Sequence, residues 1–452
     1  MKSGEIKISR FNEGLTVFKP DYYLNRGKKI ISDILDKGVD NTTLLDVAEK
    51  LYQGGIFKRV FVENDENAYK YVTASDMVKS QPLETAKRIS KKYTPWIDEM
   101  KLRDKQILMS CAGTVGNTTL VNDSFSNCIG SQEIIRIETT KVPYGYLYAY
   151  LSTTYVNQYI QSMIYGAVVP RISPAELGRL PILLAANGLQ IEIHNLILEA
   201  SKLRVEANRL LRESQKEIIE SIDFNLKKYN EQNVTCSSIS TSHLKRFEAQ
   251  FFKSEGSKII NHIEANFKFE YLNNVSEPIF RPGIFKRHYV NEGIEFLGGS
   301  DIVKAIPASE KKLSKSKTSH LDAMIIKENW ILVTCGGTIG YSVLVDRMTA
   351  GKAASQHILR VIPKGMPTGY IYAFMSSTIG LKAIQSFTYG SVIPQIEPHH
   401  LELLPIPVLD EEVMNSIHQK VMKYKENIGN AIEKELKAID LIEKEIESWQ
   451  KS

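Results

Sequence analysis

The sequence has 452 residues, of which 43% are hydrophobic and 24% are charged, a composition typical of globular proteins. A chain of this length is too long for one compact core, so we expect two to four domains. Its net charge of +5 indicates a mild preference for polyanions. No apolar run reaches the roughly 18–20 residues that cross a bilayer, and residues 1–14 lack the apolar stretch of a signal peptide. We therefore expect a cytoplasmic protein without a membrane partner.

The first half of the chain mixes strand and helix signals. Residues 105–121 contain an apolar run, a glycine turn and a second apolar run, which predicts a β-hairpin. In residues 145–164, aromatic and aliphatic side chains recur at helical spacing, which predicts one docked amphipathic helix. Residues 165–182 then predict a short strand, a turn limited by proline, and an exit loop.

A long helix is predicted next. Residues 189–229 contain no glycine or proline, and leucine recurs at every seventh position, at Leu189, Leu196, Leu203 and Leu210. Apolar residues fill the companion positions, and Glu, Lys and Arg flank them, which is typical of a heptad seam. A polar, serine-rich stretch at 230–243 predicts an exposed connector.

The second half of the chain repeats the first. Residues 110–182 align without a gap with residues 334–406, and 30 of these 73 pairs are identical. Upstream the copies drift, although residues 54–62 still resemble 282–290. The period is far longer than the ~20–50 residues of a solenoid repeat, which indicates a tandem duplication of a whole domain. We expect the well-aligned part to be scaffold and the drifting part to be where the copies differ in function.

The C-terminal segment 410–450 repeats the helix, with a seam at Val421, Ile428, Ile442 and Trp449. Such a seam must be buried, either on its own domain or on the other helix. Helices of roughly forty residues, about 60 Å long, have too little globular surface to cover them, so we expect mutual packing. The predicted fold class is α+β: two similar mixed α/β domains separated by two long helices in an antiparallel coiled coil, with pseudo-twofold symmetry. The predicted ranges are domain 1 (1–183), helix 1 (184–232), domain 2 (233–407) and helix 2 (408–452).

Motifs of catalysis and metal binding are missing from the sequence. The glycine-rich segments 113–119 and 336–342 lack the lysine of a phosphate-binding loop. Neither a nucleophile elbow, a zinc-protease motif nor the Asn/Asp-Pro-Pro-aromatic stretch of amino-methyltransferases occurs. The cysteines form no C-x-x-C pair, so we expect buried thiols at Cys111, Cys128, Cys236 and Cys335. We expect no catalytic residue, metal or cofactor in this chain.

Three repeated features together resemble the specificity subunit of type I restriction–modification systems. They are the motif S/T-C-x-G-T-[VI]-G, the motif YG[AS]V[VI]P with its following LPI, and the heptad helix after each copy. RFEAQFF and FKPDYY are similar to the module starts of that family, whereas LPILLAANG departs from the usual LPIPV, which the second copy keeps.

The resemblance implies two target recognition domains, each reading one half of a split double-stranded DNA site, with the half-sites about one helical turn (~34 Å) apart. It implies that the helices act as spacer and as docking surface for two modification subunits. Those partners would carry S-adenosylmethionine and methylate adenine, and a restriction or translocase subunit would join them. This chain would be non-catalytic and hold no cofactor.

Phosphate contacts should supply affinity, and base edges should supply specificity. The basic candidates lie where the copies drift: Lys58, Arg59, Lys91, Lys92, Lys286, Arg287, Lys315 and Lys317. Solvated surface charge is the alternative for each. Arg171 aligns with Gln395, and since arginine suits guanine and glutamine suits adenine, this pair could read different bases. A structural role in the loop is the alternative for both.

Other functions stay open on the sequence alone. An interaction scaffold without DNA would explain the helices and the duplication, but not the twinned motifs. A fused methyltransferase would need the motif that is missing, whereas a fused nuclease stays open, because the spacing of a nuclease acidic cluster is too loose to recognise in the sequence. A recognition subunit of a related DNA-defence system is a third possibility.

Overall fold

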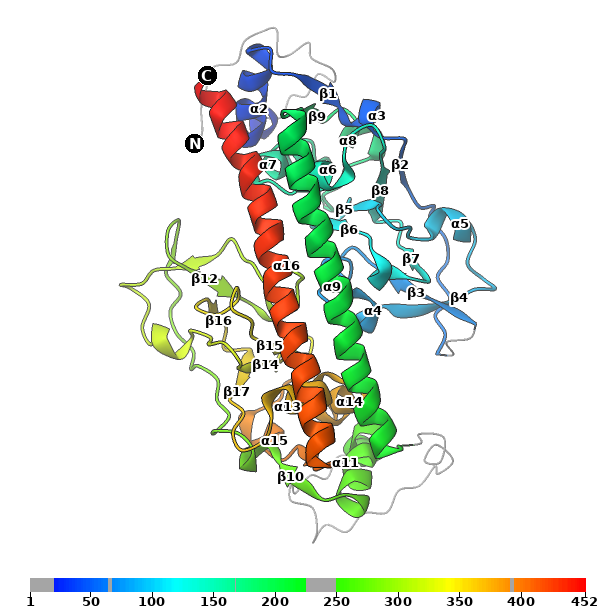
Figure 1. The fold of residues 1–452 in the computed structure, drawn as a ribbon, viewed down its shortest axis with the longest axis vertical. Helices are drawn as coiled ribbons and strands as arrows, with labels where there is room; N and C mark the ends of the chain where they lie inside the picture. The colour runs from blue at the N-terminus through cyan, green and yellow to red at the C-terminus, as the bar shows by residue number, and fades with distance from the viewer. Residues whose placement is uncertain (1–19, 64–66, 167, 225–248, 391–393) are drawn as a thin grey trace. The chain divides into compact units, whose positions relative to one another are not determined.

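The structure is a computed structural model that describes residues 20–63, 67–166, 168–224, 249–390 and 394–452 (Figure 1). The predicted connector 230–243, Cys236 and residues 1–14 lie outside the described residues. The chain divides into two compact units, which we call unit 1 (Met1–Val205 with Asn430–Ser452) and unit 2 (Glu206–Gly429). Each unit contains part of both long helices, so the four predicted domain ranges stay a prediction.

Unit 1 contains the first copy of the repeat. Its elements are α1 (Pro20–Tyr23), α2 (Arg26–Asp36), β1 (Asn41–Thr43), α3 (Leu44–Val47), β2 (Lys50–Gln53), β3 (Ala68–Val72), α4 (Pro82–Thr85), β4 (Lys87–Ser90), α5 (Ile97–Met100), β5 (Ile107–Ser110), β6 (Thr118–Leu120), η2 (Asp123–Phe125), β7 (Cys128–Gly130), β8 (Ile134–Glu138), α6 (Tyr144–Leu151), α7 (Thr154–Ser162), α8 (Pro174–Leu177) and β9 (Pro181–Leu183). The strands form an antiparallel sheet β2-β8-β5-β6, a mixed sheet β4-β3-β7 and the pair β1-β9. The first copy is therefore mixed α and β.

Unit 2 contains the second copy. Its elements are α10 (Ala249–Lys253), α11 (Glu255–Asn266), β10 (Phe269–Tyr271), η5 (Leu272–Asn274), β11 (Tyr289–Val290), β12 (Ile294–Leu297), α12 (Gly299–Ile302), β13 (Lys312–Leu313), η6 (Leu321–Ala323), β14 (Ile331–Thr334), β15 (Ser342–Leu344), β16 (Ala353–Ala354), β17 (Ile358–Val361), α13 (Thr368–Ser376), α14 (Thr378–Ser386), α15 (Pro398–Leu401) and β18 (Pro405–Pro407). The sheets are β15-β14-β17, β11-β13-β12-β16 and β10-β18, so they follow the plan of the first copy.

The predicted hairpin is confirmed, because β5 and β6 pair antiparallel with Met109 opposite Thr118. The prediction of one helix over 145–164 is wrong, because two helices, α6 and α7, occupy this segment. The extended backbone of Thr153 separates them, and its hydroxyl oxygen accepts a hydrogen bond from the Val156 N–H at 3.3 Å, which starts α7. Ser377 begins α14 in the same way. The first helix is also not amphipathic, since residues 145–151 are all buried.

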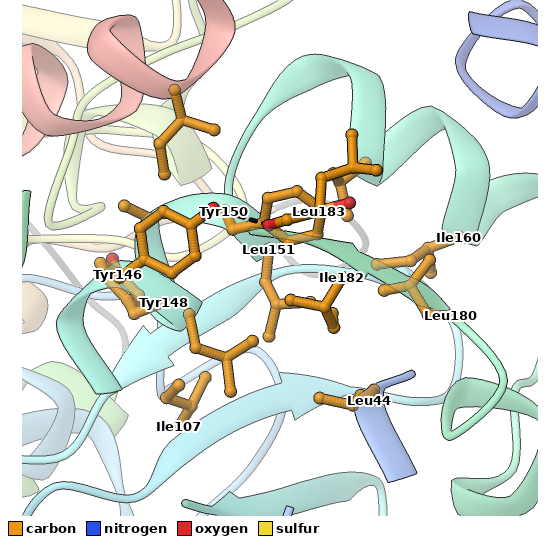
Figure 2. Packing of buried hydrophobic residues seen from close by; sticks show 14 of the residues in the cluster. Leu44, Ile107, Tyr146, Tyr148, Tyr150, Leu151, Ile160, Leu180, Ile182 and Leu183 are labelled. Atoms are coloured by element: carbon orange, nitrogen blue, oxygen red, sulfur yellow. Dashed lines mark hydrogen bonds between the residues drawn. The ribbon is translucent and has the colours of Figure 1, made fainter. Parts of the chain in front are cut away.

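The predicted exit loop is also wrong, since residues 181–183 form β9 and pair with β1. This pair closes over the core of unit 1 (Figure 2), where the Tyr146 hydroxyl donates a 2.7 Å hydrogen bond to the Leu183 carbonyl. The expected strand before the proline is reduced to an isolated bridge between Tyr165 and Arg171. Before β9, α8 begins with a capping box of Ser173 and Glu176.

Each copy buries one arginine completely. Arg136 on β8 donates hydrogen bonds to the carbonyl oxygens of Ile134, Gly130 and Met100, at 3.0, 2.7 and 3.2 Å. Arg360 on β17 donates to the equivalent carbonyls of Ile358, Ala354 and Met324. Burial lowers the pKa of both guanidinium groups, to about 10 for Arg360. These arginines tie the central sheet of each copy to the strands β7 and β16 of its second sheet.

The two long helices are α9 (Asn187–Ile222) and α16 (Glu411–Lys451). In unit 1, Arg204 Nη2 lies 2.7 Å from Glu435 Oε2, and Lys434 Nζ lies 2.5 Å from Glu199 Oε2. In unit 2, Lys420 Nζ lies 2.6 Å from Glu217 Oε2. Unit 1 thus joins the first part of α9 to the last part of α16, and unit 2 joins the last part of α9 to the first part of α16.

The residues of the predicted seam differ in burial. Partly buried are Leu189, Leu196, Leu203, Leu210 and Trp449, whereas Val421, Ile428 and Ile442 are buried. On α9 the fully buried stripe consists of the companion positions and their neighbours: Ile193, Ile197, Ala200, Ala207, Leu211, Ile218 and Ile222.

Candidate nucleic-acid interface

In unit 1, strand pairing brings four of the predicted basic residues together. Residues 60–62 lie beside β4, because the Val62 N–H donates to the Arg88 carbonyl at 3.1 Å and the Ser90 N–H donates to the Val60 carbonyl at 2.9 Å. Phe61 lies opposite Ile89. Lys58 and Arg59 directly precede these paired residues, and Lys91 and Lys92 lie in the turn that directly follows β4. We call these four exposed residues the first basic cluster.

Aromatic rings lie between the charges of the first basic cluster. The Arg59 guanidinium is 5.7 Å from the centre of the Tyr71 ring, the Lys91 ammonium is 5.2 Å from that of Tyr69, and the Lys92 ammonium is 5.4 Å from that of Tyr93. Tyr93 is 59% exposed. Burial raises the pKa of Tyr71, and the nearby Arg59 opposes that rise. Tyr71 is buried and Tyr69 is partly buried, so of these three rings Tyr93 is the one with an exposed face on which a base can stack, beside cations that attract phosphates.

Unit 2 builds a second basic cluster from the equivalent strands. Tyr289 on β11 pairs with Leu313 on β13, and the Ser314 N–H donates to the His288 carbonyl at 2.9 Å. Lys286 and Arg287 directly precede these paired residues, and Lys315 and Lys317 lie in the turn that follows β13. The cluster consists of four exposed residues: Lys286, Arg287, Lys315 and Lys317.

The arginine of the second basic cluster repeats the contact of the first. The Arg287 guanidinium is 5.5 Å from the centre of the Phe296 ring, and Phe296 on β12 is the counterpart of Tyr71 on β3. Arg287 also donates a 3.2 Å hydrogen bond to the side chain of Gln356. The two units therefore present the same arrangement of cation and ring, although much of the sequence around the two arginines drifts between the copies.

Arg171 and Gln395 occupy the same backbone position in their copies. The Arg171 N–H donates to the Tyr165 carbonyl at 2.8 Å, and the Gln395 N–H donates to the Tyr389 carbonyl at 2.9 Å. Arg171 also bridges to Ala112, just after β5, so it lies at the end of the central sheet and not in the sheet that carries the first basic cluster. The structure thus groups the lysines and arginines of each cluster and places Arg171 and Gln395 on a separate loop.

The aromatic partners of the clusters are absent from the candidates that the sequence suggested. The pattern Tyr69-Lys-Tyr71 on one strand was an available signal, because alternate residues of a strand share a face. Nothing in the sequence revealed that this face lies beside residues 58–61 and 91–93, because that proximity depends on the register between segments far apart in the chain.

Other kinds of site receive no support from the described residues. Cys111, Cys128 and Cys335 are free and buried, as expected, and burial raises the pKa of Cys111 to about 11 and that of Cys128 to about 12. Among the residues that the structure describes, no three His, Cys, Asp or Glu side chains are grouped to hold a metal ion. No described helix combines the length and the apolar character needed to cross a membrane.

Comparison with known proteins gives a family for part of the chain. Residues 249–441 match the family model of the type I restriction modification DNA specificity domain. The S subunit of a type I restriction–modification system from M. genitalium is 12% identical, with 92% of this chain and 97% of that chain covered and a TM-score of 0.34. The HsdS subunit from Thermoanaerobacter tengcongensis is 13% identical, with 90% and 96% covered and a TM-score of 0.29. No curated protein matches the chain. The match of residues 249–441 to this family model confirms the resemblance drawn from the repeated motifs.

Proposed function

We propose that this chain is the DNA specificity subunit of a type I restriction–modification complex, and that each copy of the repeat reads one half of a bipartite double-stranded site. The observation that carries the proposal is the pair of basic clusters, each built on equivalent strands with an arginine over a ring. The family match of residues 249–441 supports a DNA ligand for the second cluster, and the internal repeat extends that argument to the first.

The long helices set the distance between the two half-sites in this proposal. In each unit the start of one helix contacts the end of the other, which is the pattern that an antiparallel coiled coil requires. The exposed faces of α9 and α16 would dock two modification subunits, which bind S-adenosylmethionine and methylate adenine, and a restriction subunit would join them. The chain itself would contribute recognition and no catalytic step.

A DNA-binding experiment tests the carrying observation. The full chain is titrated with a fluorescent mixed-sequence duplex over a range of KCl concentrations. Reversing two charges of the first basic cluster, Lys91→Glu with Lys92→Glu, should weaken binding at least tenfold and reduce the slope of log K against log salt by about two. Lys216→Glu with Lys444→Glu is the matched control, because both lysines lie on the long helices and are 72% and 69% exposed. If both double variants lost the same DNA affinity, the assignment of the first basic cluster as a DNA contact would be contradicted.

Methylation mapping tests the division of labour. The chain is co-expressed with its modification subunit, and methylated adenines in the host DNA are located by single-molecule sequencing. Inserting seven residues into both α9 and α16 should change the gap between the half-sites and leave the half-sites themselves unchanged. An unchanged gap would contradict the spacer role, and methylation or S-adenosylmethionine binding by the purified chain alone would contradict the non-catalytic role.

A further inference from the structure

The same five residues, Gly-Ile-Phe-Lys-Arg, occur in both copies, at 55–59 and at 283–287. They lie in the part of the repeat where the copies otherwise drift, and they contain half of each basic cluster. A segment kept the same in both copies, next to segments that differ, must meet a demand that both copies share. The structure shows how the side chains of this segment are placed in each unit.

The phenylalanine anchors the segment in each unit. Phe57 packs on a buried cluster of Tyr71, Ile89, Met100 and Ile129. Phe285 packs on the equivalent cluster, which consists of Phe296, Leu313, Met324 and Ala353. With this ring fixed inward, the residues beside it are held outward.

The isoleucine before the anchor projects into solvent in both units. Ile56 is 77% exposed and Ile284 is 94% exposed. Scattered apolar side chains on a surface need no explanation, but these two occupy the same position twice, each followed at once by the anchor and by two exposed cations. In unit 1 the backbone just before Ile56 is also braced, because a Cβ atom on Gly55 would lie 2.8 Å from the Trp96 ring.

We propose that this segment, which we call the shared finger (55–59 and 283–287), is a DNA contact that does not distinguish base sequences. The inference rests on the proposed function and deepens it. Lysine and arginine would contact phosphates, and the isoleucine would press against sugars or a base step, as apolar side chains do in DNA grooves. The adjacent cations favour a polyanion over an apolar protein partner as the occupant of this surface.

The discriminating contacts are then expected among cluster neighbours that differ between the copies. Tyr93 and Trp96 of unit 1 correspond to Lys317 and His320 of unit 2, and all four are exposed. Trp96 and His320 share the same left-handed backbone, with φ of 52° and 53°. Positions with the same backbone but different side chains can discriminate between base sequences. Positions with the same side chain in both copies are suited to contacts that do not depend on base sequence.

The test uses the full chain and three unrelated duplexes of about 30 base pairs: one rich in A·T, one rich in G·C and one mixed. The double variant Ile56→Ser with Ile284→Ser should weaken binding about tenfold for every duplex, without changing the salt slope. The variant Lys58→Gln with Arg59→Gln should lower that slope by about two. Ile191→Ser is the matched control, since Ile191 is a 54% exposed isoleucine on α9.

Three results would overturn the inference. If the isoleucine variant bound DNA as tightly as the native chain, the proposed apolar contact would be contradicted. If it lost affinity for only one duplex, the shared finger would discriminate between base sequences, contrary to the inference. If the chain with native sequence bound none of the duplexes at low salt, the proposed function would fail and the inference with it. If the native chain bound DNA, and the Lys91 and Lys92 variant bound it more weakly but the finger variants did not, the role of the shared finger would be contradicted and the proposed function would stand.

Discussion

The two copies share a scaffold but contact the long helices differently. In unit 1 the hydroxyl of Tyr148 on α6 donates to Glu435 on α16, and Glu435 also pairs with Arg204 on α9. Burial and Glu435 together raise the pKa of Tyr148 well above its ordinary value. In unit 2 the counterpart Tyr372 stacks on Tyr424, with ring centres 6.0 Å apart and hydroxyls 3.4 Å apart.

The alignment of the two copies continues into the long helices, so equivalent helix positions of the two units can be compared directly. The Gly145 N–H donates to His194 Nδ1 at 3.1 Å, and the Gly369 N–H donates to His418 Nδ1 at 3.0 Å. By the same offset, Arg204 and Glu435 correspond to Ile428 and Leu211, which are apolar and buried. At this position of the repeat, unit 1 thus has a buried ion pair between its helices, where unit 2 has two buried apolar residues; the ion pair of unit 2, between Lys420 and Glu217, lies elsewhere along the helices. A buried polar pair is a recognised device for fixing helix register.

The largest effect on stability is expected from replacing the buried arginine that both copies share. Arg136→Met removes a buried guanidinium that donates to three carbonyls and Arg360→Met one that donates to four, and each should lower the free energy of unfolding by about 4 kcal/mol. Urea denaturation followed by circular dichroism measures this, with Arg209→Met on the exposed face of α9 as control. A loss in only one of the two variants would mean that the scaffolds are not equivalent.

The ion pair should show the next largest effect, and only in unit 1. Glu435→Ala leaves Arg204 largely buried without its carboxylate and should destabilise the chain by about 3 kcal/mol. Tyr424→Phe in unit 2 should change stability by less than about 1 kcal/mol, because a 3.4 Å hydroxyl contact is weak.

A double variant tests whether apolar residues can replace the Arg204–Glu435 ion pair. Arg204→Ile with Glu435→Leu copies the residues of unit 2 and should recover most of the stability that Glu435→Ala loses. A double variant as unstable as Glu435→Ala would show that apolar residues cannot replace the pair at this position.

A smaller effect on stability should depend on pH and occur in both units. Burial lowers the pKa of His194 and His418 below the ordinary 6.5, and Lys425 adds to the shift at His418. As the pH falls below 6.5, the unfolded chain binds protons first, so stability should fall until the pH passes the lowered pKa of the folded state.

Replacing these histidines tests that dependence. His194→Asn and His418→Asn keep an acceptor for the glycine N–H but do not titrate. Each should make stability less dependent on pH between 7.5 and 5.5, measured by urea denaturation at several pH values. A pH dependence that neither substitution changes would assign it to other groups.

The smallest effect on stability is expected from removing the N-terminal caps of α7 and α14. Thr153→Ala and Ser377→Ala each remove the side chain that caps α7 or α14, and each should cost about 1 kcal/mol. Thermal melts measure both. Ser221→Ala near the end of α9 is a control, because its hydroxyl bonds only within the helix, to the Glu217 carbonyl.

The sequence predicts what depends on local pattern. The hairpin of β5 and β6 and the two long helices follow from runs of apolar residues and heptad spacing, and comparing the chain with itself reveals the duplication. The break between α6 and α7 escaped prediction because aromatic residues keep helical spacing across it, whereas the capping signal of Thr153 is a single side chain.

Features that depend on distant pairing could not be predicted. Strand β9 exists because β1, from much earlier in the chain, pairs with it. The basic residues could be named one by one, but their grouping rests on Phe61 lying opposite Ile89. Likewise the exposure of Ile56 follows from Phe57 facing inward, which composition and spacing do not reveal.

The strands beside the basic clusters lie at the outer edges of their sheets. β11 ends the order β11-β13-β12-β16, and residues 60–62 lie outside β4 in the same way. Open edges invite other chains to add strands, and charged side chains at such edges oppose that aggregation. The charges of Lys58, Arg59, Lys286 and Arg287 should therefore also oppose pairing between copies of the chain, and neutralising all four at once should promote self-association.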